Sequence, residues 1–348
     1  MKELKLGIIG FGFMGKWHYN HAGQLDNIRV TAICDIDTSK LTNIENGIST
    51  YSDYHDLLKD PNVETVLISV PNHLHCQIAV DATCAHKNII VEKPVAMNLV
   101  EFDTIYDSAQ KNSVIFTVHQ NRRWDKDYLI VKKALKENLL GNVFHIQSSL
   151  YGFFGLVHDW HVCKKYGGGM MYDWGVHLID QILDLIPAKV TSVSADIRTI
   201  VNKEVDDYYR LVFHFEDGHT ASIELGTFML KPVPRWYVAG DKGTLIIENF
   251  LGQGTIYRSN GMLEKLPEQP TNINSGPTRT FSTEPDGLIN SEDLPTVSGE
   301  WNDFFINYIQ VINNKAELIV KPEQVRRVLA LMEASWKSSN TKSSVKFE

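Results

Sequence analysis

The stretch KLGIIGFGFMG, residues 5–15, constrains the fold of this chain more than any other stretch. It places glycines at positions 10, 12 and 15 directly after a β-branched apolar run and directly before a segment with helical spacing. In a strand–turn–helix unit the first glycine permits the tight turn, the second lets a pyrophosphate approach the backbone, and the third lets the helix pack closely. The pattern predicts a dinucleotide-binding loop made of Gly10, Phe11, Gly12, Phe13, Met14 and Gly15.

Strand-like and helical segments alternate through the first third of the chain. This alternation predicts crossover units, and therefore a parallel sheet with helices on both faces. Together with the glycine loop it predicts a dinucleotide-binding α/β domain of the Rossmann type over residues 1–121. The expected strands lie within residues 5–10, 30–35, 65–70, 88–93 and 113–119, and the expected helices within residues 14–25, 75–86 and 99–112.

The pattern changes after Asn121, where one helical stretch is followed by long strands in succession. EDGH at residues 216–219 and GDKG at 240–243 have the composition of hairpin turns, which predicts a mainly antiparallel sheet. We expect an α+β second domain over residues 122–348, in which the C-terminal helices can pack back on the first domain. The expected elements are a helix at 125–141, strands at 143–151, 189–197, 207–215, 219–226, 235–240 and 244–250, an irregular excursion at 261–296, and helices at 297–314 and 322–339.

Composition excludes several classes of partner. The chain has 348 residues, 43% hydrophobic content and a net charge of −8, so it can form a large core but lacks the clustered positive charge that nucleic acids or anionic lipids require. Its 4 cysteines form no CxxC pair, which disfavours a disulfide framework or a cysteine zinc site. No signal peptide or membrane-spanning run is found, so we expect a cytoplasmic protein without membrane or nucleic-acid partners.

Asp35 closes the second expected strand, 20 residues beyond Gly15. A carboxylate at this position can accept hydrogen bonds from the adenosine ribose hydroxyls and would repel a 2′-phosphate. The residue therefore favours NAD over NADP as the cofactor. The alternative is a turn role for Asp35 within DIDTSK, with Asp37 as a competitor for the ribose.

Polar residues follow two of the buried strands, in SVPNHLH at residues 69–75 and in EKP at residues 92–94. Ligands in an open parallel sheet collect outside the carboxyl ends of the strands. A lysine beside a glutamate at such an end therefore indicates function, although Glu92 and Lys93 could also be an ordinary surface ion pair.

These motifs carry a family resemblance. GFGFMG, PNHLH, VEKP, QNRRWD and GGGMMYDWGVHLID, in this order, resemble the glucose-fructose oxidoreductase / inositol dehydrogenase / rhizopine catabolism family, written Gfo/Idh/MocA. The resemblance covers the whole chain and is strongest over residues 4–180. It implies a Rossmann domain followed by a domain on a large open sheet. It also implies NAD(H)- or NADP(H)-dependent oxidation or reduction of a hydroxyl or carbonyl on a sugar, cyclitol or related compound.

Three residues are the candidate catalytic groups. Asp173 and His177 are four residues apart, so on a helix they share one face. Oxidation of a secondary alcohol needs a base for the hydroxyl proton, and His177 is suited to this because a histidine titrates near neutrality. The resemblance places Lys93 beside the same hydroxyl, where it would stabilise negative charge on the oxygen. Asp173 would orient a substrate hydroxyl or His177 itself.

The resemblance also implies further contacts. Asn72, His75 and Glu92 match positions that border the nicotinamide ribose, although Asn72 could instead cap a helix. Asn121 and Arg123 match a motif at the domain junction and could contact substrate or cofactor, or form a structural hinge. Trp124, Trp160 and Trp174 could stack on a sugar ring or belong to the core. Ser69 and Gln120 complete the expected cofactor contacts, whereas His18 and His21 are expected to be structural.

Two other activities and a metal site are alternatives to the hypothesis of an NAD-dependent dehydrogenase. A relative of this fold could use NAD for transient hydride transfer while hydrolysing a glycosidic bond, or could bind NAD as a non-catalytic regulator. Asp173, His177, Asp180 and the HDWH run at 158–161 contain possible metal ligands, but no recognised ligand spacing is found, so we expect no metal. Finally, the aromatic residues on both faces of strand 207–215 predict a homodimer or homotetramer formed through the second sheet.

Overall fold

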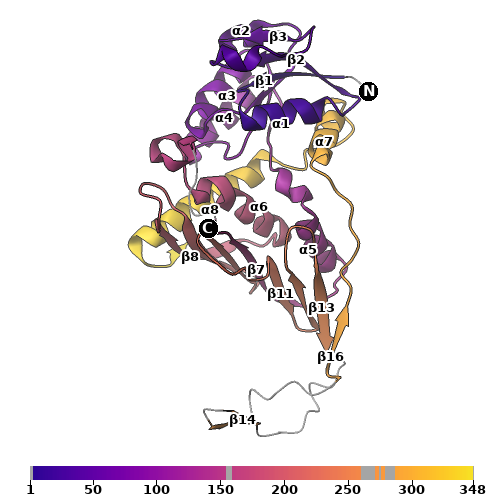
Figure 1. Ribbon diagram of the computed structural model, residues 1–348, viewed down its shortest axis with the longest axis vertical. Helices are drawn as coiled ribbons and strands as arrows, with labels where there is room; N and C mark the ends of the chain where they lie inside the picture. Colours follow the sequence, from indigo (N-terminus) through magenta and orange to yellow (C-terminus); the bar gives the residue numbers. More distant parts are fainter. Residues whose placement is uncertain (1–2, 154–158, 260–270, 274–275, 279–286, 348) are drawn as a thin grey trace.

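The computed structural model describes residues 3–153, 159–259, 271–273, 276–278 and 287–347. Two sheets dominate it, one in each half of the chain (Figure 1). The first is a 6-stranded sheet of order β3-β2-β1-β4-β5-β6, and every neighbouring pair is parallel. Its strands are β1 (Leu4–Ile9), β2 (Ile28–Cys34), β3 (Ser49–Tyr51), β4 (Thr65–Ile68), β5 (Asn88–Val91) and β6 (Phe116–Val118).

The first sheet is buried because its strands are nearly continuous apolar runs covered by helices. All four residues of β4 are buried, and each large aliphatic side chain taken out of water stabilises the fold by roughly 2 kcal/mol. The covering helices are α1 (Phe13–Ala22), α2 (Tyr54–Lys59), α3 (His75–Cys84) and α4 (Leu99–Lys111).

The second sheet has 9 strands in the order β16-β13-β12-β11-β7-β10-β9-β8-β17. It is antiparallel except between β7 and β10, which run parallel. Both predicted hairpins are present, joining β9 to β10 and β11 to β12. The strands are β7 (Val143–Tyr151), β8 (Val190–Arg198), β9 (Tyr208–Phe215), β10 (Thr220–Gly226), β11 (Trp236–Gly240), β12 (Gly243–Ile247), β13 (Gly254–Ser259), β16 (Ile289–Glu292) and β17 (Val345–Lys346).

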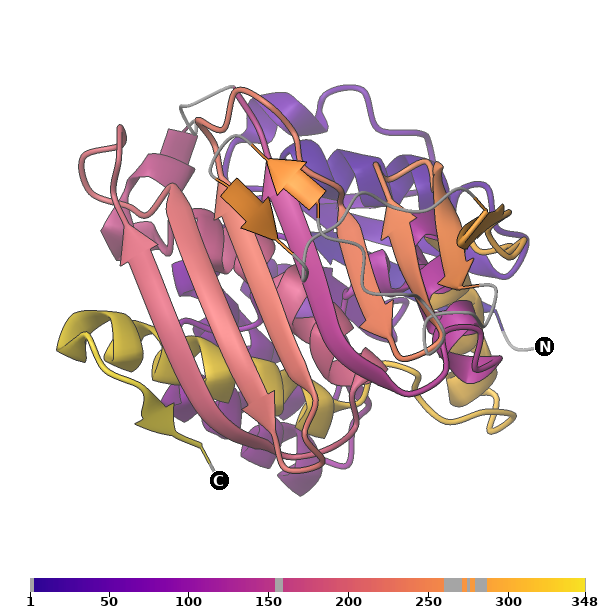
Figure 2. The same ribbon diagram turned by 90° about the horizontal axis from the view of Figure 1, so that it is seen from below.

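Helices cover one face of the second sheet and leave the other uncovered (Figure 2). Along β9 the side chains of Tyr209, Leu211, Phe213 and Phe215 are buried, whereas the alternate residues are exposed or half-buried. This period of two puts one side of the strand against the helices. The helices of this half are α5 (Lys126–Lys136), α6 (Val176–Leu185), α7 (Asn302–Ile312) and α8 (Pro322–Thr341).

The two C-terminal helices join the halves of the molecule. Tyr308 of α7 lies 3.2 Å, oxygen to oxygen, from Thr65 of β4. On α8, Arg326 forms an ion pair of 2.7 Å with Asp103 of α4, and Ser338 accepts a hydrogen bond of 3.0 Å from the backbone of Ala195 in β8. The chain therefore returns to its first domain through α7 and α8 before β17 adds the last strand to the second sheet.

Several local expectations differ from the structure. Strand β3 and helix α2 lie in a stretch without the apolar run used to find the other elements. The strands of the first sheet end one or two residues earlier than expected, so Asp35, Ser69, Glu92 and His119 lie just beyond their carboxyl ends. The predicted irregular excursion at 261–296 falls largely outside the described residues. The described part of this range contains two short paired strands, β14 (Thr271–Ile273) and β15 (Gly276–Thr278), and then β16. No helix in the described part of the chain combines the length and apolarity needed to span a membrane.

Candidate active site

The glycine loop is open where a dinucleotide would approach it. Gly10 has φ +92°, and a Cβ atom there would lie 2.5 Å from the carbonyl oxygen of Ser69, so only glycine fits. A Cβ atom on Gly15 would lie 2.0 Å from the Gly10 oxygen, but at Gly12 no atom lies within 4 Å. Helix α1 then begins at Phe13 without a side-chain cap. Open space beside uncapped helix amides fits a pyrophosphate.

The other loop residues divide between core and surface. Phe11 is buried and packs on Tyr19, whereas Phe13 is 86% exposed. The Ser69 hydroxyl donates a hydrogen bond of 2.7 Å to the Gly10 oxygen and so ties β4 to the loop. Phe11 and Ser69 therefore shape the loop, and Phe13 is left on the surface.

Asp35 lies at the end of β2 and contacts the glycine loop directly. Its carboxylate accepts hydrogen bonds from the backbone of Phe11 at 2.7 Å and of Asp37 at 2.9 Å. The Lys40 ammonium lies 3.2 Å from each carboxylate oxygen. Asp35 is thus placed where an adenosine ribose is expected, with a cation beside it that the sequence reasoning did not include.

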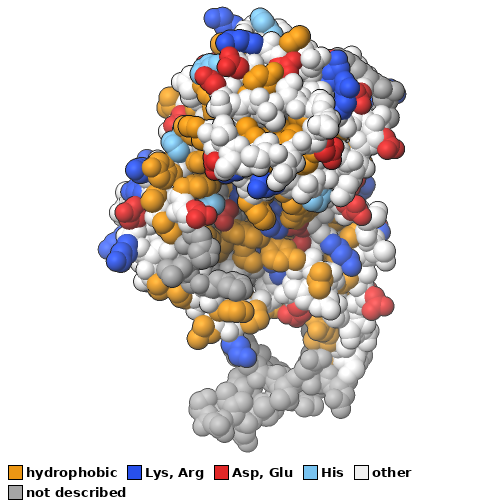
Figure 3. Space-filling view, turned by 45° about the horizontal axis from the view of Figure 1, so that its top comes forward, with side chains coloured by type: hydrophobic (Ala, Val, Ile, Leu, Met, Phe, Trp, Pro, Cys, Tyr) orange, Lys and Arg blue, Asp and Glu red, His pale blue; other side chains and the backbone are white. Residues whose placement is uncertain are grey.

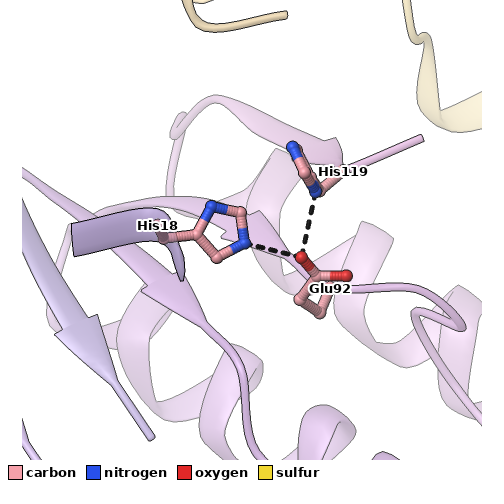
Figure 4. Close-up of side chains that lie close together, drawn as sticks. All are labelled: His18, Glu92 and His119. Carbon is pink, nitrogen blue, oxygen red and sulfur yellow. Dashed lines mark hydrogen bonds and ion pairs between the residues drawn. The ribbon is translucent and has the colours of Figure 1, made fainter. Parts of the chain in front are cut away.

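Glu92 is enclosed between two histidines. His18 Nε2 lies 2.6 Å and His119 Nδ1 lies 2.9 Å from the same Glu92 oxygen, Oε1 (Figure 4). All three side chains are buried. Burial raises the pKa of Glu92, but its two imidazole partners outweigh that effect and hold the pKa well below its usual range. Burial lowers the pKa of His18 to about 4. Glu92 is therefore a buried carboxylate that accepts hydrogen bonds from both imidazoles, and the lowered pKa of His18 favours the neutral form of that ring.

The geometry of this cluster argues for hydrogen bonding and against a metal ion. The ligand atoms of the three residues lie within 4.8 Å of one another, as a metal site would need. However, histidines that bind a metal almost always donate their second ring N–H to an acceptor. The second ring nitrogens, His18 Nδ1 and His119 Nε2, are buried without a partner in the described chain.

The same strand ends fix the backbone around Lys93. Glu92 Oε2 accepts a hydrogen bond of 3.1 Å from the Lys93 amide, and His75 Nδ1 lies 2.7 Å from the Pro94 oxygen. Asn72 donates at 2.8 Å to the carbonyl of Gly167. The polar groups of Asn72, His75 and Glu92, expected beside the nicotinamide ribose, thus bond to the protein itself. His75 and Glu92 hold the EKP turn, and Asn72 holds the segment at Gly167.

Lys93 meets Asp173 across the two halves of the chain. Its ammonium lies 2.7 Å from Asp173 Oδ1 and 2.9 Å from the Asp173 carbonyl oxygen. Burial raises the pKa of Asp173, but the Lys93 charge and hydrogen bond outweigh it, so the net pKa lies below the usual value. The side chains keep 19% and 28% of their surface exposed. This ion pair is therefore accessible, unlike the Glu92 cluster.

His177 completes the group from the start of α6. Its Nδ1 lies 3.0 Å from Gln120 Oε1, so Nδ1 carries the proton and Nε2 keeps a free lone pair. Burial, then the charges of Lys93 and Arg122, lower the pKa of His177 well below its ordinary value, and not to the neutral range expected from its type. Gln120 Nε2 is buried without a partner in the described chain, which leaves one donor for a ligand.

A wide turn presents Asp173 to Lys93. Residues Met171–Gly175 form a π-helical turn that leads into α6, a feature frequent at functional sites. The turn replaces the regular helix that the i, i+4 spacing predicted. Asp206 holds its start, because its carboxylate accepts from the Met171 amide at 2.7 Å.

The remaining predicted residues lie in different surroundings. Arg123 is buried and forms bonds of 2.7 and 2.6 Å with the two oxygens of Asp180, which ties the domain junction to α6. Asn121 and Trp124 are buried beside it, in the short helix η3 (Asn121–Trp124). Trp160 stacks on His161 with ring centroids 3.8 Å apart, whereas His158 of the HDWH run lies outside the described residues.

Sequence reasoning missed three residues of this region: His119, Arg122 and Lys40. His119 could have been found, because it follows β6 at the edge where Asp35 and Glu92 end their strands. Arg122 precedes the buried Arg123, and nothing in the dipeptide says which arginine faces the site. Lys40 lies five residues beyond Asp35 in a turn, and its contact depends on the local chain path.

Comparisons with known proteins agree with this geometry. The family model described as an oxidoreductase family with an NAD-binding Rossmann fold matches residues 4–120, and the GFO/IDH/MocA C-terminal domain matches residues 128–246. An uncharacterised oxidoreductase of Schizosaccharomyces pombe is 30% identical, with 89% of this chain and 88% of that protein covered. The scyllo-inositol 2-dehydrogenase (NADP(+)) of Bacillus subtilis is 27% identical, with 99% and 96% covered. A solved NAD-binding protein from Listeria innocua superimposes with TM-score 0.94 and 37% identity over 100% of both chains.

Proposed function

The chain belongs to the Gfo/Idh/MocA oxidoreductase family, and we propose that it transfers hydride between the nicotinamide of NAD and a secondary hydroxyl or carbonyl of a sugar, cyclitol or related polyol. The observation that carries this proposal is the ion pair between Lys93 and Asp173, which are far apart in the sequence, together with His177, whose pKa is lowered by burial and then by the Lys93 charge. The inositol dehydrogenase among the relatives supports the substrate class.

Each of the three residues has a role that follows from its contacts. The nicotinamide, when bound, accepts or supplies the hydride. Lys93 would donate a hydrogen bond to the reacting oxygen and stabilise the negative charge that develops on it. His177 would take the hydroxyl proton on Nε2 in the oxidising direction, because Gln120 holds the proton of the ring on Nδ1. Asp173 orients the Lys93 ammonium.

The lowered pKa of His177 favours its neutral form in the resting protein. An unprotonated imidazole is the form that a general base needs, so oxidation should not lose activity as pH falls through 6.5, the ordinary histidine value. The loss should come at lower pH, where His177 becomes protonated. The measurement is the pH dependence of kcat/KM for oxidation. An acid limb centred at or above pH 6.5 would contradict the role of His177.

The test of the catalytic roles separates chemistry from cofactor binding. In Lys93→Met and His177→Asn we expect turnover to fall by about 100-fold or more, because each variant lacks a group that acts on the reacting oxygen. NAD affinity, measured by calorimetry, should change less than threefold. Matched controls are Lys136→Met and His145→Asn, since Lys136 is exposed on α5 and His145 lies in β7. If either variant lost NAD affinity but kept turnover at saturating NAD, the assignment would be wrong.

The cofactor preference depends on Asp35. We propose NAD in preference to NADP, because the Asp35 carboxylate at the end of β2 would repel a 2′-phosphate. Lys40, at 3.2 Å, moderates this preference by neutralising part of the charge. We expect Asp35→Ser to narrow the ratio of kcat/KM for NAD over NADP by about tenfold, and Lys40→Gln to widen it. An unchanged ratio in Asp35→Ser would remove Asp35 from the cofactor site.

We further propose that copies of the chain associate through the uncovered face of the second sheet. Tyr237 of β11 is 38% exposed and Tyr257 of β13 is 39% exposed, although both lie in the interior of a sheet with ordered neighbours. Aromatic side chains are enriched at protein interfaces. Analytical ultracentrifugation should give a dimer or tetramer, and Tyr237→Glu should shift it toward monomer. A monomeric wild-type protein at micromolar concentration would contradict the proposal.

A further inference from the structure

A cavity with aromatic residues in its lining includes Arg122, together with one further cation and two carboxylates. The Arg122 guanidinium carbon lies 3.9 Å from the ring centroid of Trp174, 5.4 Å from that of Phe250 and 5.6 Å from that of Trp301. These rings come from the π-helical turn, the segment after β12 and the segment before α7. A guanidinium covered on its faces keeps its N–H groups free along its edge, where they can bind a planar anion.

Asp125 fixes this arrangement. Its Oδ2 accepts a hydrogen bond of 2.9 Å from Arg122 Nη1, and its Oδ1 accepts one of 2.8 Å from the Trp301 indole nitrogen. The Asp125 side chain is buried, so both of its oxygens are engaged within the protein. The arginine is therefore held in one orientation before any ligand arrives, which reduces the entropy cost of binding.

Part of the Arg122 guanidinium remains available to a ligand. Only Nη1 is paired with Asp125, and the side chain keeps 20% of its surface exposed. It faces a cavity of about 380 Å³ whose lining includes Arg122, Lys126, Phe250, Glu300 and Trp301. Figure 3 shows the hollow below the first domain, with apolar side chains forming its wall and Lys or Arg side chains among them.

This cavity is electrostatically coupled to the proposed catalytic residues. Burial raises the pKa of Asp173 and lowers that of His177, and for both residues the Arg122 charge acts with the larger Lys93 charge to lower the pKa. The Trp174 ring centroid lies 3.9 Å from the Arg122 guanidinium carbon and 6.1 Å from the His177 ring centroid, so the guanidinium and this histidine flank the same ring. Gln181 of α6 donates a hydrogen bond of 2.8 Å to the Arg122 carbonyl and ties the arginine to the helix that carries His177. A substrate oxidised at Lys93 and His177 would therefore extend toward Arg122.

We propose that the substrate carries an anionic substituent, a carboxylate or a phosphate, which Arg122 binds through its free guanidinium edge. This inference rests on the proposed function, because it concerns the substrate of the same site. Lys126 at the rim of the cavity adds a second cation, while the aromatic walls exclude water and strengthen the ion pair. Glu300 also lines the cavity and is exposed like Lys126, so these two charges offset each other and Arg122 is the group that would bind the anion.

The test compares matched ligands on the NADH-saturated protein by titration calorimetry. The probes are D-glucose, myo-inositol, D-glucuronate, D-glucose 6-phosphate and inorganic phosphate. We expect the wild type to bind at least one of the two anionic sugars about tenfold tighter than D-glucose. Comparing the affinity for D-glucuronate with that for D-glucose 6-phosphate then shows whether the site prefers a carboxylate or a phosphate. The variants are Arg122→Gln, Arg122→Lys, and the control Lys136→Gln on the exposed face of α5.

The expected result is that Arg122→Gln loses the tenfold preference, Arg122→Lys keeps part of it, and Lys136→Gln keeps all of it. Equal binding of neutral and anionic sugars by the wild type, or no binding of any probe, overturns the inference without depending on how the variants fold. A preference that survives in a folded Arg122→Gln protein, checked by its melting temperature, also overturns it.

Turnover distinguishes this inference from the proposed function. If the anionic sugars bind with Arg122-dependent preference but no probe reduces NAD, the proposed function fails while the binding subsite stands. If myo-inositol or D-glucose reduces NAD, and D-glucuronate and D-glucose 6-phosphate have no higher kcat/KM, the proposed function stands. The inference that Arg122 binds an anionic substituent is then wrong.

Discussion

Glu92 and Lys93 are neighbours at the end of β5, yet they belong to opposite kinds of polar site. Glu92 is enclosed by His18 and His119, with every side chain buried and the aromatic rings of Phe304 and Phe305 packed around them. Lys93 faces outward to Asp173, and this pair keeps 19% and 28% of its side-chain surface exposed. The end of β5 thus supplies one residue to each of two polar groups. His18, Glu92 and His119 form the closed cluster, and Lys93 and Asp173 form the open pair.

The difference teaches which polar residues stabilise the fold and which can act on a ligand. A carboxylate that is buried and accepts from two imidazoles offers little surface to a substrate, and removing one member leaves unpaired polar groups behind. An accessible ammonium paired with one carboxylate can exchange part of its hydrogen bonding for a reacting oxygen. Residue type alone does not distinguish the Glu92 cluster from the Lys93–Asp173 pair, because each contains an acid and a base at hydrogen-bond distance.

The largest expected effect is the loss of stability in Glu92→Leu. This change leaves the ring N–H groups of His18 and His119 buried without an acceptor, which should lower the free energy of unfolding by about 3 kcal/mol. Denaturant unfolding measures this, with Glu137→Leu, at an exposed position directly after α5, as a control expected within about 0.5 kcal/mol. Unchanged stability with lost NAD affinity would make Glu92 a cofactor contact, as its position in the sequence predicted.

A smaller effect, on activity and not on stability, is expected in Asp173→Asn. The amide keeps an oxygen for Lys93 but removes the negative charge, so the ammonium is held less firmly at 2.7 Å. A charge-assisted hydrogen bond contributes about 1.5 to 3 kcal/mol, which corresponds to a fall in kcat of about 10- to 100-fold. The midpoint of denaturant unfolding should stay close to that of the wild type. A large loss of stability with normal kcat would place Asp173 with the closed cluster.

The sequence predicted the fold well because the fold depends on patterns that are local. The glycine loop, the alternation of strands and helices in the first domain, and the hairpins of β9–β10 and β11–β12 all follow from short-range periodicity and turn chemistry. The parallel pairing of β7 with β10 could not be predicted in this way. It is a long-range contact between segments about 75 residues apart, and neither strand carries a mark of its partner.

The site was predicted by residue type but not by contact. Lys93 and Asp173, two of the three predicted catalytic residues, are in contact, whereas the expected meeting of Lys93 and His177 at the reacting oxygen stays a prediction. Arg122 and Arg123 show what the sequence could not predict. Both are arginines at the domain junction, but Arg123 turns inward to Asp180 and Arg122 turns to the cavity beside Trp174. Their opposite directions are set by the short helix η3, in which neighbouring side chains point about a third of a turn apart.

The last expected effect, which is the smallest when it is counted per pH unit, tests the comparison between the two sites through pH. The pKa of His18 is about 4 in the folded protein and near 6.5 when the residue is exposed on unfolding. The unfolded chain therefore binds more protons between these values, so stability should fall as pH drops from 6.5 toward 4, by up to about 1.4 kcal/mol per pH unit for this residue. Glu92, with its lowered pKa, acts in the same direction, because it loses its stabilising charge only on acidification.

In His18→Gln the slope of unfolding free energy against pH should be shallower over this range. His55→Gln is the control, since His55 is exposed on α2. If this slope were the same in His18→Gln as in the wild type, the acid sensitivity of the protein would arise elsewhere. Protonation of the closed cluster would then cost no more stability than protonation of the open pair.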